Sequence, residues 1–267
     1  LIIMDEPTTA ITQKEVQNMF AVIRDLQKRG IAVLFVSHKL DEVFEIAQHF
    51  TIFRSGKNVW SGETKELTQA TVTKYMTGRD IEEESFVYHE KPDAKTVLEV
   101  KDLSLTNGFK NCSFSVKEGE ILGITGFLGS GRTELAETIF GIHKAESGEI
   151  RLCGEKVEIN SVLDAMDKGI GYVPPERGVE GLFMDQSIAD NISVTRWSDH
   201  QKGLFIDRSS IEESVDHWVK ELSIKIGSID HSMRTLSGGN AQKCVLAKWL
   251  SRDLKVLILN GPTVGVD

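Results

Sequence analysis

The stretch GFLGSGRT, residues 126–133, decides the fold of this chain. It fits the pattern G-x-x-x-x-G-K-[ST] with arginine at the lysine position, and it stands between an apolar, strand-like run and a helical pattern. Its glycines let backbone N–H groups converge on phosphate oxygens, and the following helix adds partial positive charge. This context favours a phosphate-binding loop over a glycine-rich turn without a ligand. The residues expected to bind the phosphates are Gly126, Gly129, Ser130, Gly131, Arg132 and Thr133.

We call residues 126–133 the phosphate loop, and two of its side chains define its chemistry. Thr133 is expected to supply a hydroxyl to Mg²⁺, as the last residue of the pattern does. Arg132 keeps the positive charge of the usual lysine, but its planar guanidinium is not a compact ammonium.

Two carboxylates follow an apolar run at the beginning of the chain, in LIIMDEP, residues 1–7. Ligands of α/β sheets bind at the carboxyl ends of strands, so Asp5 is expected to hold Mg²⁺ through water and Glu6 to polarise an attacking water. His38 follows the next apolar run, residues 31–36, where it would hydrogen-bond a γ-phosphate. The alternatives are a helix cap with a solvated charge for the acids and a structural role for the histidine.

The end of the chain repeats the first element without its carboxylates. LILNGPT, residues 257–263, has Asn260 and Gly261 where the first copy has Asp5 and Glu6, and Asn260 lies 255 positions after Asp5. That spacing exceeds the periods of solenoid repeats and matches the scale of a duplicated domain. We therefore expect the chain to hold the back of one domain and the front of its relative.

LSGGNAQK, residues 236–243, places a serine and two glycines before an expected helix. Ser237 and the amides of Gly238 and Gly239 would form an anion-binding nest, with Asn240 beside them. In isolation, the stretch is more often a serine-capped helix. Its position between the phosphate loop and the second strand element favours the binding function.

Composition narrows the class of protein. The 267 residues are 40% hydrophobic and 27% charged, as in ordinary globular domains. The longest apolar runs have about six residues, whereas a membrane-spanning helix needs about 20. The three cysteines are odd in number and far apart, which argues against a disulfide framework or metal cluster and suits a reducing cytosol. The net charge of −9 argues against sequence-independent binding of nucleic acid.

The hydrophobic pattern alternates strands and helices, which predicts an α/β fold. The first strand has no polar break, which is typical of a buried parallel strand. We expect helices over residues 13–29, 39–50, 211–222 and 240–250. We expect strands over residues 1–4, 31–36, 51–60, 96–105, parts of 111–126, and 257–259. Residues 80–96 are polar and contain a proline, which indicates a linker.

These motifs together resemble those of a known family. DEPT, residues 5–8, resembles the Walker B motif of ABC-type ATPases, VSHKLDEVFEIA resembles their switch-histidine segment, and LSGGNAQK resembles their signature. The form LSGGN-x-QK followed by LAKWL, with GRTE ending the phosphate loop, is similar to one subgroup. That subgroup is the two-cassette ATPase subunit of bacterial monosaccharide importers of the ribose, galactose and arabinose kind.

The resemblance implies P-loop NTPase cassettes with a mostly parallel core sheet, an antiparallel β subdomain and a helical subdomain. Residues 1–78 would end the first cassette, 79–96 would link, and 97–267 would form most of the second. The implied function is hydrolysis of ATP with Mg²⁺ to import a simple sugar. The implied partners are membrane permease subunits and, through them, a periplasmic sugar-binding protein, with peripheral attachment at the cytoplasmic face of the membrane and no nucleic acid.

ABC cassettes pair head to tail, so the resemblance also implies two composite ATP sites. One would join Asp5, Glu6 and His38 to residues 237–240 and be intact. The other would join the phosphate loop to Asn260 and Gly261 and lack both carboxylates. We therefore expect one hydrolytic site and one that binds nucleotide without efficient turnover, and we expect residues 1–267 alone to be inactive.

Three other functions remain as alternatives. A two-cassette ATPase acting on ribosomes shares the doubled architecture, but the short acidic linker and the LSGGN-x-QK form disfavour it. A chromosome- or repair-type ATPase needs long heptad arms, which the sequence lacks. A non-catalytic nucleotide sensor fits the second cassette but leaves Asp5 and Glu6 unexplained. The sequence does not identify the sugar, and Pro175 and Glu176 receive no role.

Overall fold

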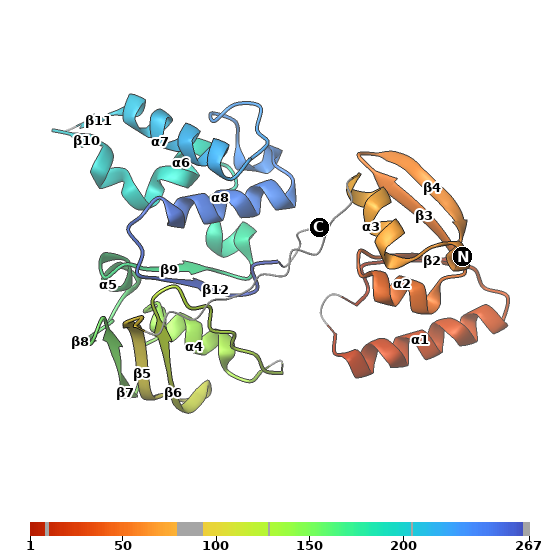
Figure 1. Cartoon of the computed structure of the whole chain (residues 1–267), viewed down its shortest axis with the longest axis horizontal. Helices are drawn as coiled ribbons and strands as arrows, with labels where there is room; N and C mark the ends of the chain where they lie inside the picture. Colours follow the sequence, from red (N-terminus) through yellow and green to blue (C-terminus); the bar gives the residue numbers. More distant parts are fainter. Residues whose placement is uncertain (9–10, 79–92, 128, 204, 264–267) are drawn as a thin grey trace. The chain divides into compact units, whose positions relative to one another are not determined.

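The computed structural model describes residues 1–8, 11–78, 93–127, 129–203 and 205–263 (Figure 1). The chain divides into two compact units, unit 1 (Leu1–Tyr88) and unit 2 (His89–Asp267), and each is considered by itself. Residues 79–92 of the expected linker lie outside the described residues, so the domain boundaries proposed from the sequence stay predictions.

Unit 1 begins with a strand–helix–strand element. β1 (Ile2–Asp5) pairs in parallel with β2 (Val33–Val36), and α1 (Gln13–Lys28) connects them. Thr12 and Glu15 close the first turn of α1 as a capping box, which satisfies amides that a helix start leaves without partners. The helix predicted over residues 13–29 is therefore confirmed.

The rest of unit 1 packs around a β-hairpin. α2 (Leu40–Ile46) leads into β3 (His49–Arg54), which pairs antiparallel with β4 (Lys57–Glu63), and α3 (Gln69–Thr77) follows. The helix predicted over residues 39–50 is too long, because Ala47 adopts an extended conformation and the chain then joins the hairpin.

The strand pair of unit 1 is less buried than the sequence predicts. Ile3 is 64% exposed and Leu34 is 52% exposed, while the intervening side chains face the core under α1. The expectation of a strand buried on both faces is therefore wrong for β1 within the described residues. An uninterrupted apolar run shows that both faces of a strand are apolar, but it does not show which elements cover each face.

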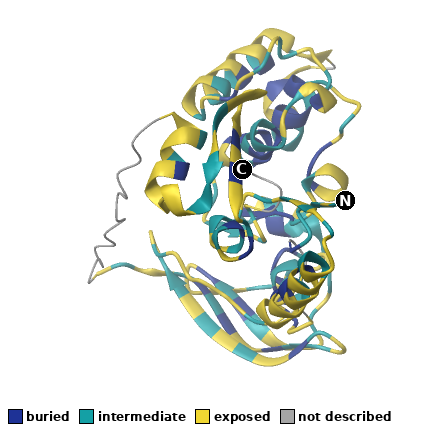
Figure 2. Ribbon diagram, turned by 90° about the vertical axis from the view of Figure 1, so that its right-hand side faces the viewer, coloured by how far each residue is buried: buried dark blue, intermediate teal, exposed yellow. Residues whose placement is uncertain are grey.

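Unit 2 opens with an antiparallel sheet of strand order β6-β5-β7-β8. Figure 2 shows this sheet at the bottom of the view, with exposed and less exposed residues alternating along its strands. Its inward side chains, among them Leu98, Val100 and Ile150, join the core of unit 2. The four strands are β5 (Thr96–Leu105), β6 (Phe109–Lys117), β7 (Ser147–Leu152) and β8 (Glu155–Val157).

A parallel strand pair forms the second layer of unit 2. β9 (Ile170–Val173) pairs with β12 (Val256–Leu259), and all four residues of β9 are buried. α5 (Val162–Asp167) packs on β9, and α4 (Arg132–Ile139) contacts β6 of the antiparallel sheet. The ring of Phe140, directly after α4, stacks on Tyr172 of β9 with ring centroids 5.1 Å apart.

The remainder of unit 2 is mostly helical, and its largest helices pack on one another. It includes a π-helical turn (Arg177–Gly181), which α8 contacts through a hydrogen bond from Lys248 Nζ to the carbonyl of Gly181 at 2.6 Å. The main elements are α6 (Ile188–Ser193), β10 (Gln201–Lys202), β11 (Phe205–Ile206), α7 (Arg208–Glu221) and α8 (Gly238–Leu250).

The structure confirms the α/β fold with an antiparallel and a helical part, but it corrects one strand. Residues 120–125, directly before the phosphate loop, form neither helix nor strand, and Ile121 is 80% exposed. Gly119, Gly123 and Gly126 interrupt this apolar run, and glycine weakens strands. Among the described residues, no helix is long and apolar enough to cross a membrane.

Candidate functional site

The carboxylates of unit 1 lie where β1 ends. Asp5 is the last residue of β1, and the amide of Glu6 donates to the carbonyl of Val36 at 2.9 Å. Glu6 has φ of 45°, in the left-handed region that non-glycine residues rarely adopt. The chain therefore turns sharply at Glu6 and places its side chain at the edge where β2 also ends.

Glu6 and His38 meet at this edge. The Oε1 atom of Glu6 accepts a hydrogen bond from the backbone amide of His38 at 3.0 Å and lies 2.8 Å from its Nδ1 atom. If the proton is on Nδ1, the ring also donates to Glu6. Because β1 and β2 are parallel, residues after their ends come together, as the sequence predicts. The two side chains remain 34% and 42% exposed, so water and a ligand reach them.

The segment behind these two residues is tied to α2. Thr8 is fully buried, and its hydroxyl donates to Glu42 Oε2 at 2.5 Å. Lys39 Nζ donates to the Thr8 carbonyl at 3.0 Å and lies 3.3 Å from Glu42 Oε1. Thr8, Lys39 and Glu42 thus connect the turn after β1 to the segment after β2. The sequence analysis missed this support, whose signal is the threonine of the Asp-Glu-Pro-Thr run.

Glycine is required at two positions of the phosphate loop. Gly131 has φ of 89°, and a Cβ there would lie 2.3 Å from the carbonyl oxygen of Gly108. A Cβ on Gly126 would lie 2.5 Å from the hydroxyl of Ser130. The loop is thus folded tightly against itself and against the turn between β5 and β6, which suits a backbone that approaches a ligand closely.

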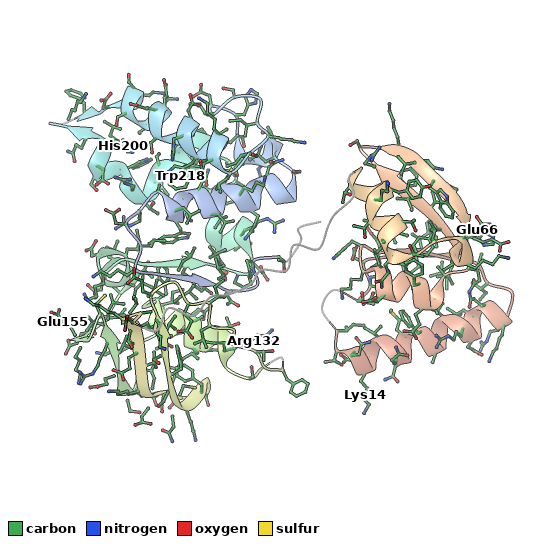
Figure 3. The ribbon with its side chains drawn as sticks, in the orientation of Figure 1. Lys14, Glu66, Arg132, Glu155, His200 and Trp218 are labelled. Carbon is green, nitrogen blue, oxygen red and sulfur yellow. The ribbon has the colours of Figure 1, made fainter. Side chains whose placement is uncertain are left out.

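Arg132, labelled in Figure 3, is the first residue of α4. Its Nη1 atom donates to the carbonyl of Gly126, at the other end of the phosphate loop. Arg132 and Asn260 both line a cavity of about 530 Å³, whose walls include β12, part of α4 and residues 119–124. The guanidinium is therefore placed at the loop, as expected for the residue in the lysine position.

Asn260 lies beside the phosphate loop at the end of β12. Its Nδ2 atom is 3.1 Å from the hydroxyl of Tyr172 and 3.4 Å from Oγ1 of Thr133. Burial raises the pKa of Tyr172, although the hydrogen bond from Asn260 opposes this shift. Tyr172 was not predicted, because an aromatic residue in a buried strand is usually part of the core. Gly261 follows with φ of 60°, close to that of Glu6.

The predicted signature lies at the beginning of α8. Ser237 directly precedes the helix, but no amide of α8 in the described chain donates to its hydroxyl. Asn240 Nδ2 donates to the Ser237 hydroxyl at 2.9 Å, and Asn240 Oδ1 accepts from the amide of Lys225 at 2.8 Å. The arrangement leaves the first amides of α8, which include those of Gly238 and Gly239, at an exposed helix N-terminus.

The predicted residues thus form three groups: residues 5, 6 and 38 in unit 1, the phosphate loop with Asn260 in unit 2, and residues 237–240 in unit 2. The predicted pairing of the first group with the third concerns two separate units and stays a prediction. No cluster of three or more histidine, cysteine or acidic residues that would hold a metal occurs in the described parts of the chain.

The comparisons with known proteins agree with the family resemblance of the motifs. A family model described as ABC transporter matches residues 109–264. The chain is 41% identical over its whole length to the ribose import ATP-binding protein RbsA of Clostridium perfringens, of which it covers 53%. It is 38% identical to a putative ribose/galactose/methyl galactoside import ATP-binding protein of Rhizobium johnstonii, of which it covers 52%. The chain spans about half the length of these curated relatives.

Solved structures show the same fold. cbiO1 from Clostridium perfringens, part of the ABC transporter complex cbiONQ, aligns with a TM-score of 0.52 at 27% identity and covers 65% of this chain and 68% of its own. A bacterial ABC transporter cassette solved as a dimer aligns with a TM-score of 0.52 at 19% identity, covering 64% of this chain and 76% of its own.

Proposed function

Because the chain belongs to the ABC transporter family, we propose that it supplies ATP-hydrolysing machinery to an importer of ribose or a similar monosaccharide. The observation that carries the proposal is the contact between Glu6 and His38 at the carboxyl ends of β1 and β2. A carboxylate held by a histidine at an accessible strand edge suits activation of water beside a phosphate. The sugar class rests on the import functions named for the relatives.

Each residue of unit 1 has a distinct role in this proposal. Glu6 accepts a proton from the attacking water, and His38 donates to Glu6 through its backbone amide and to the terminal phosphate through its ring. Asp5 is an exposed carboxylate at the strand end, a donor that fits Mg²⁺, and it would hold the ion through water. The ion, when bound, would neutralise charge on the phosphates.

Unit 2 contributes two anion-binding elements. The phosphate loop cradles a nucleotide through its backbone amides and Arg132. Ser237, Gly238, Gly239 and Asn240 offer a second group of donors at the N-terminus of α8. Asn260 and Gly261 provide no base, so the nucleotide of the phosphate loop is retained with little turnover. The partners would be permease subunits, with a sugar-binding protein outside the membrane.

Sugar-stimulated ATP hydrolysis tests this proposal. The full-length protein is assembled with its permease in proteoliposomes, and hydrolysis is measured with ribose and its binding protein present or absent. His38→Ala is expected to lower stimulated hydrolysis by about 10²-fold or more, since it removes the ring that contacts the base and would contact the phosphate. His49→Ala, an exposed histidine in β3, is the matched control and should hydrolyse ATP at the native rate.

Stimulation by ribosomes instead of by sugar would favour the alternative of a ribosome-associated ATPase. Native hydrolysis in His38→Ala would contradict the site proposed here, because the contact with Glu6 would then have no role in turnover. Binding of ATP by the variant, measured separately, distinguishes loss of chemistry from loss of the nucleotide.

A further inference from the structure

The end of β12 offers a poor site for a divalent metal. Mg²⁺ is held in proteins by oxygen ligands, usually with a carboxylate among them. Asn260 instead directs its Nδ2 atom toward Thr133 Oγ1 and the hydroxyl of Tyr172. An N–H group does not ligate a cation, and the amide brings no negative charge in either orientation of its oxygen and nitrogen.

In the described part of unit 2, the side-chain partners of Asn260 are both hydroxyls, and Glu120, which lines the same cavity, accepts at Oε2 from the amide of Lys117 at 2.7 Å. Gly261 has no side chain, although the first strand end has Glu6 at the matching position. Glu137 and Glu180 reach Tyr172 only through long-range electrostatics, and Glu137 Oε2 lies 2.9 Å from Nε2 of His143. The residues present therefore do not fit Mg²⁺, contrary to the sequence-based expectation for Thr133.

The same groups fit the oxygens of a phosphate. The amide of Asn260, the hydroxyl of Thr133 and the guanidinium of Arg132 can all donate hydrogen bonds at the phosphate loop. A phenol is neutral at pH 7 and burial raises the pKa of Tyr172 further, so its hydroxyl adds no negative charge. An anion that enters beside Asn260 meets these donors at the strand end, whereas the carboxylate of Glu120, elsewhere in the cavity wall, accepts from the amide of Lys117.

We propose that the phosphate loop of unit 2 binds a nucleoside triphosphate without requiring a divalent cation, and that Asn260 determines this metal independence. The inference rests on the proposed function, since it assumes that the loop binds nucleotide. In an ordinary site, one role of the metal is to offset repulsion between the phosphates and a neighbouring carboxylate. Asparagine removes that repulsion, so removal of the metal costs little affinity.

Equilibrium dialysis of radiolabelled ATP against residues 1–267 tests the inference, because the sequence contains the phosphate-loop pattern once. The dissociation constant is measured in excess Mg²⁺ and in excess EDTA. For the native chain the two values should agree within about threefold, since no charge pair at the site depends on the metal. For Asn260→Asp, EDTA should weaken binding by about tenfold or more relative to Mg²⁺, because one carboxylate then faces uncompensated phosphates.

Two further variants serve as controls. One tests whether the added charge must lie at the end of β12, and the other tests whether the hydroxyl of Thr133 contacts the phosphate or the metal. Asn160→Asp makes the same change at an exposed position of unit 2 and should keep the native ratio. Thr133→Val should weaken ATP binding equally in Mg²⁺ and in EDTA, since its hydroxyl is assigned to the phosphate. If the hydroxyl ligated only the metal, Thr133→Val would instead weaken ATP binding only in Mg²⁺.

The outcomes are distinct for the two proposals. If EDTA weakened ATP binding to the native chain as strongly as it weakens binding to Asn260→Asp, metal independence would be wrong. The phosphate loop would still be a nucleotide site. The absence of ATP binding in both conditions would overturn this inference and the assignment of the phosphate loop together. Circular dichroism of each variant, matched to native, ensures that a loss of binding is not a loss of fold.

Discussion

β1 and β12 end in similar backbone turns but present opposite chemistry. After each strand the chain bends and enters a Pro-Thr turn, with φ of 45° at Glu6 and 60° at Gly261. The first end presents a glutamate in contact with a histidine, whereas the second presents an amide between two hydroxyls. The comparison teaches that the turn can persist when the groups suited to hydrolysis are replaced by groups suited to binding.

The neighbouring strands differ as well. β1 pairs with β2, which follows it along the chain and is followed two residues later by His38, whereas β12 pairs with β9, which precedes it, so the two neighbouring strands are not counterparts.

Glu6→Gln is the strongest way to break this comparison. In the full-length protein it should lower ATP turnover by about 10²–10⁴-fold, because glutamine keeps the shape but not the basicity of the side chain. Steady-state hydrolysis with the permease present measures the effect, and ATP binding should be retained. Glu45→Gln, an exposed acid on α2 that pairs with Arg24, is the matched control and should turn over normally. Near-native turnover in Glu6→Gln would mean that the first end is no more catalytic than the second.

The sequence predicted the groups that lie next to one another along the chain or at the ends of paired parallel strands. Glu6 and His38 meet because β1 and β2 are parallel, and the phosphate loop leads into α4 as its pattern predicts. These predictions rest on local geometry, which a single sequence contains.

The sequence did not predict features that depend on distant packing. Tyr172 contacts Asn260, 88 positions away in the sequence, only because β9 and β12 pair. The residues of either strand do not indicate which strand it pairs with. The exposure of Ile3 and the irregular path of residues 120–127 depend on which elements cover each face. An apolar pattern shows what can be buried, and tertiary packing decides what is buried.

A buried lysine distinguishes unit 2 from the described residues of unit 1. Lys248 of α8 is only 9% exposed, and burial lowers its pKa to about 8 from the ordinary 10.5. Between these values the unfolded chain holds a proton that the folded chain has lost, so this group makes stability rise with pH. Relative to Lys248→Met, the native protein should therefore gain up to about 3 kcal/mol of unfolding free energy between pH 7 and 10.5.

The prediction compares native with Lys248→Met because Cys244 changes the stability of both proteins with pH in the opposite direction. Burial raises the pKa of that thiol from 9.0 to about 12, so its contribution to stability falls as the pH rises above 9. Urea denaturation of both proteins across the pH range cancels this contribution. Lys220→Met, at an exposed position of α7, should show no such shift. A pH-independent difference for Lys248→Met would mean that burial in the fold does not lower the pKa of Lys248.

The smallest effect concerns the backbone that the two ends share. Gly261→Ala should lower the free energy of unfolding by about 1–2 kcal/mol, because an alanine at φ of 60° meets its own carbonyl group. Gly178→Ala is the matched control, since nothing lies within 4 Å of the position that its methyl group would take and its φ is not positive. Reducing the backbone entropy of the unfolded chain should leave Gly178→Ala unchanged or about 0.4–1 kcal/mol more stable. Urea denaturation of both variants measures the contrast. Equal stabilities would show that the turn after β12 does not need the left-handed conformation found at Glu6, and the correspondence between the two strand ends would then be limited to their sequences.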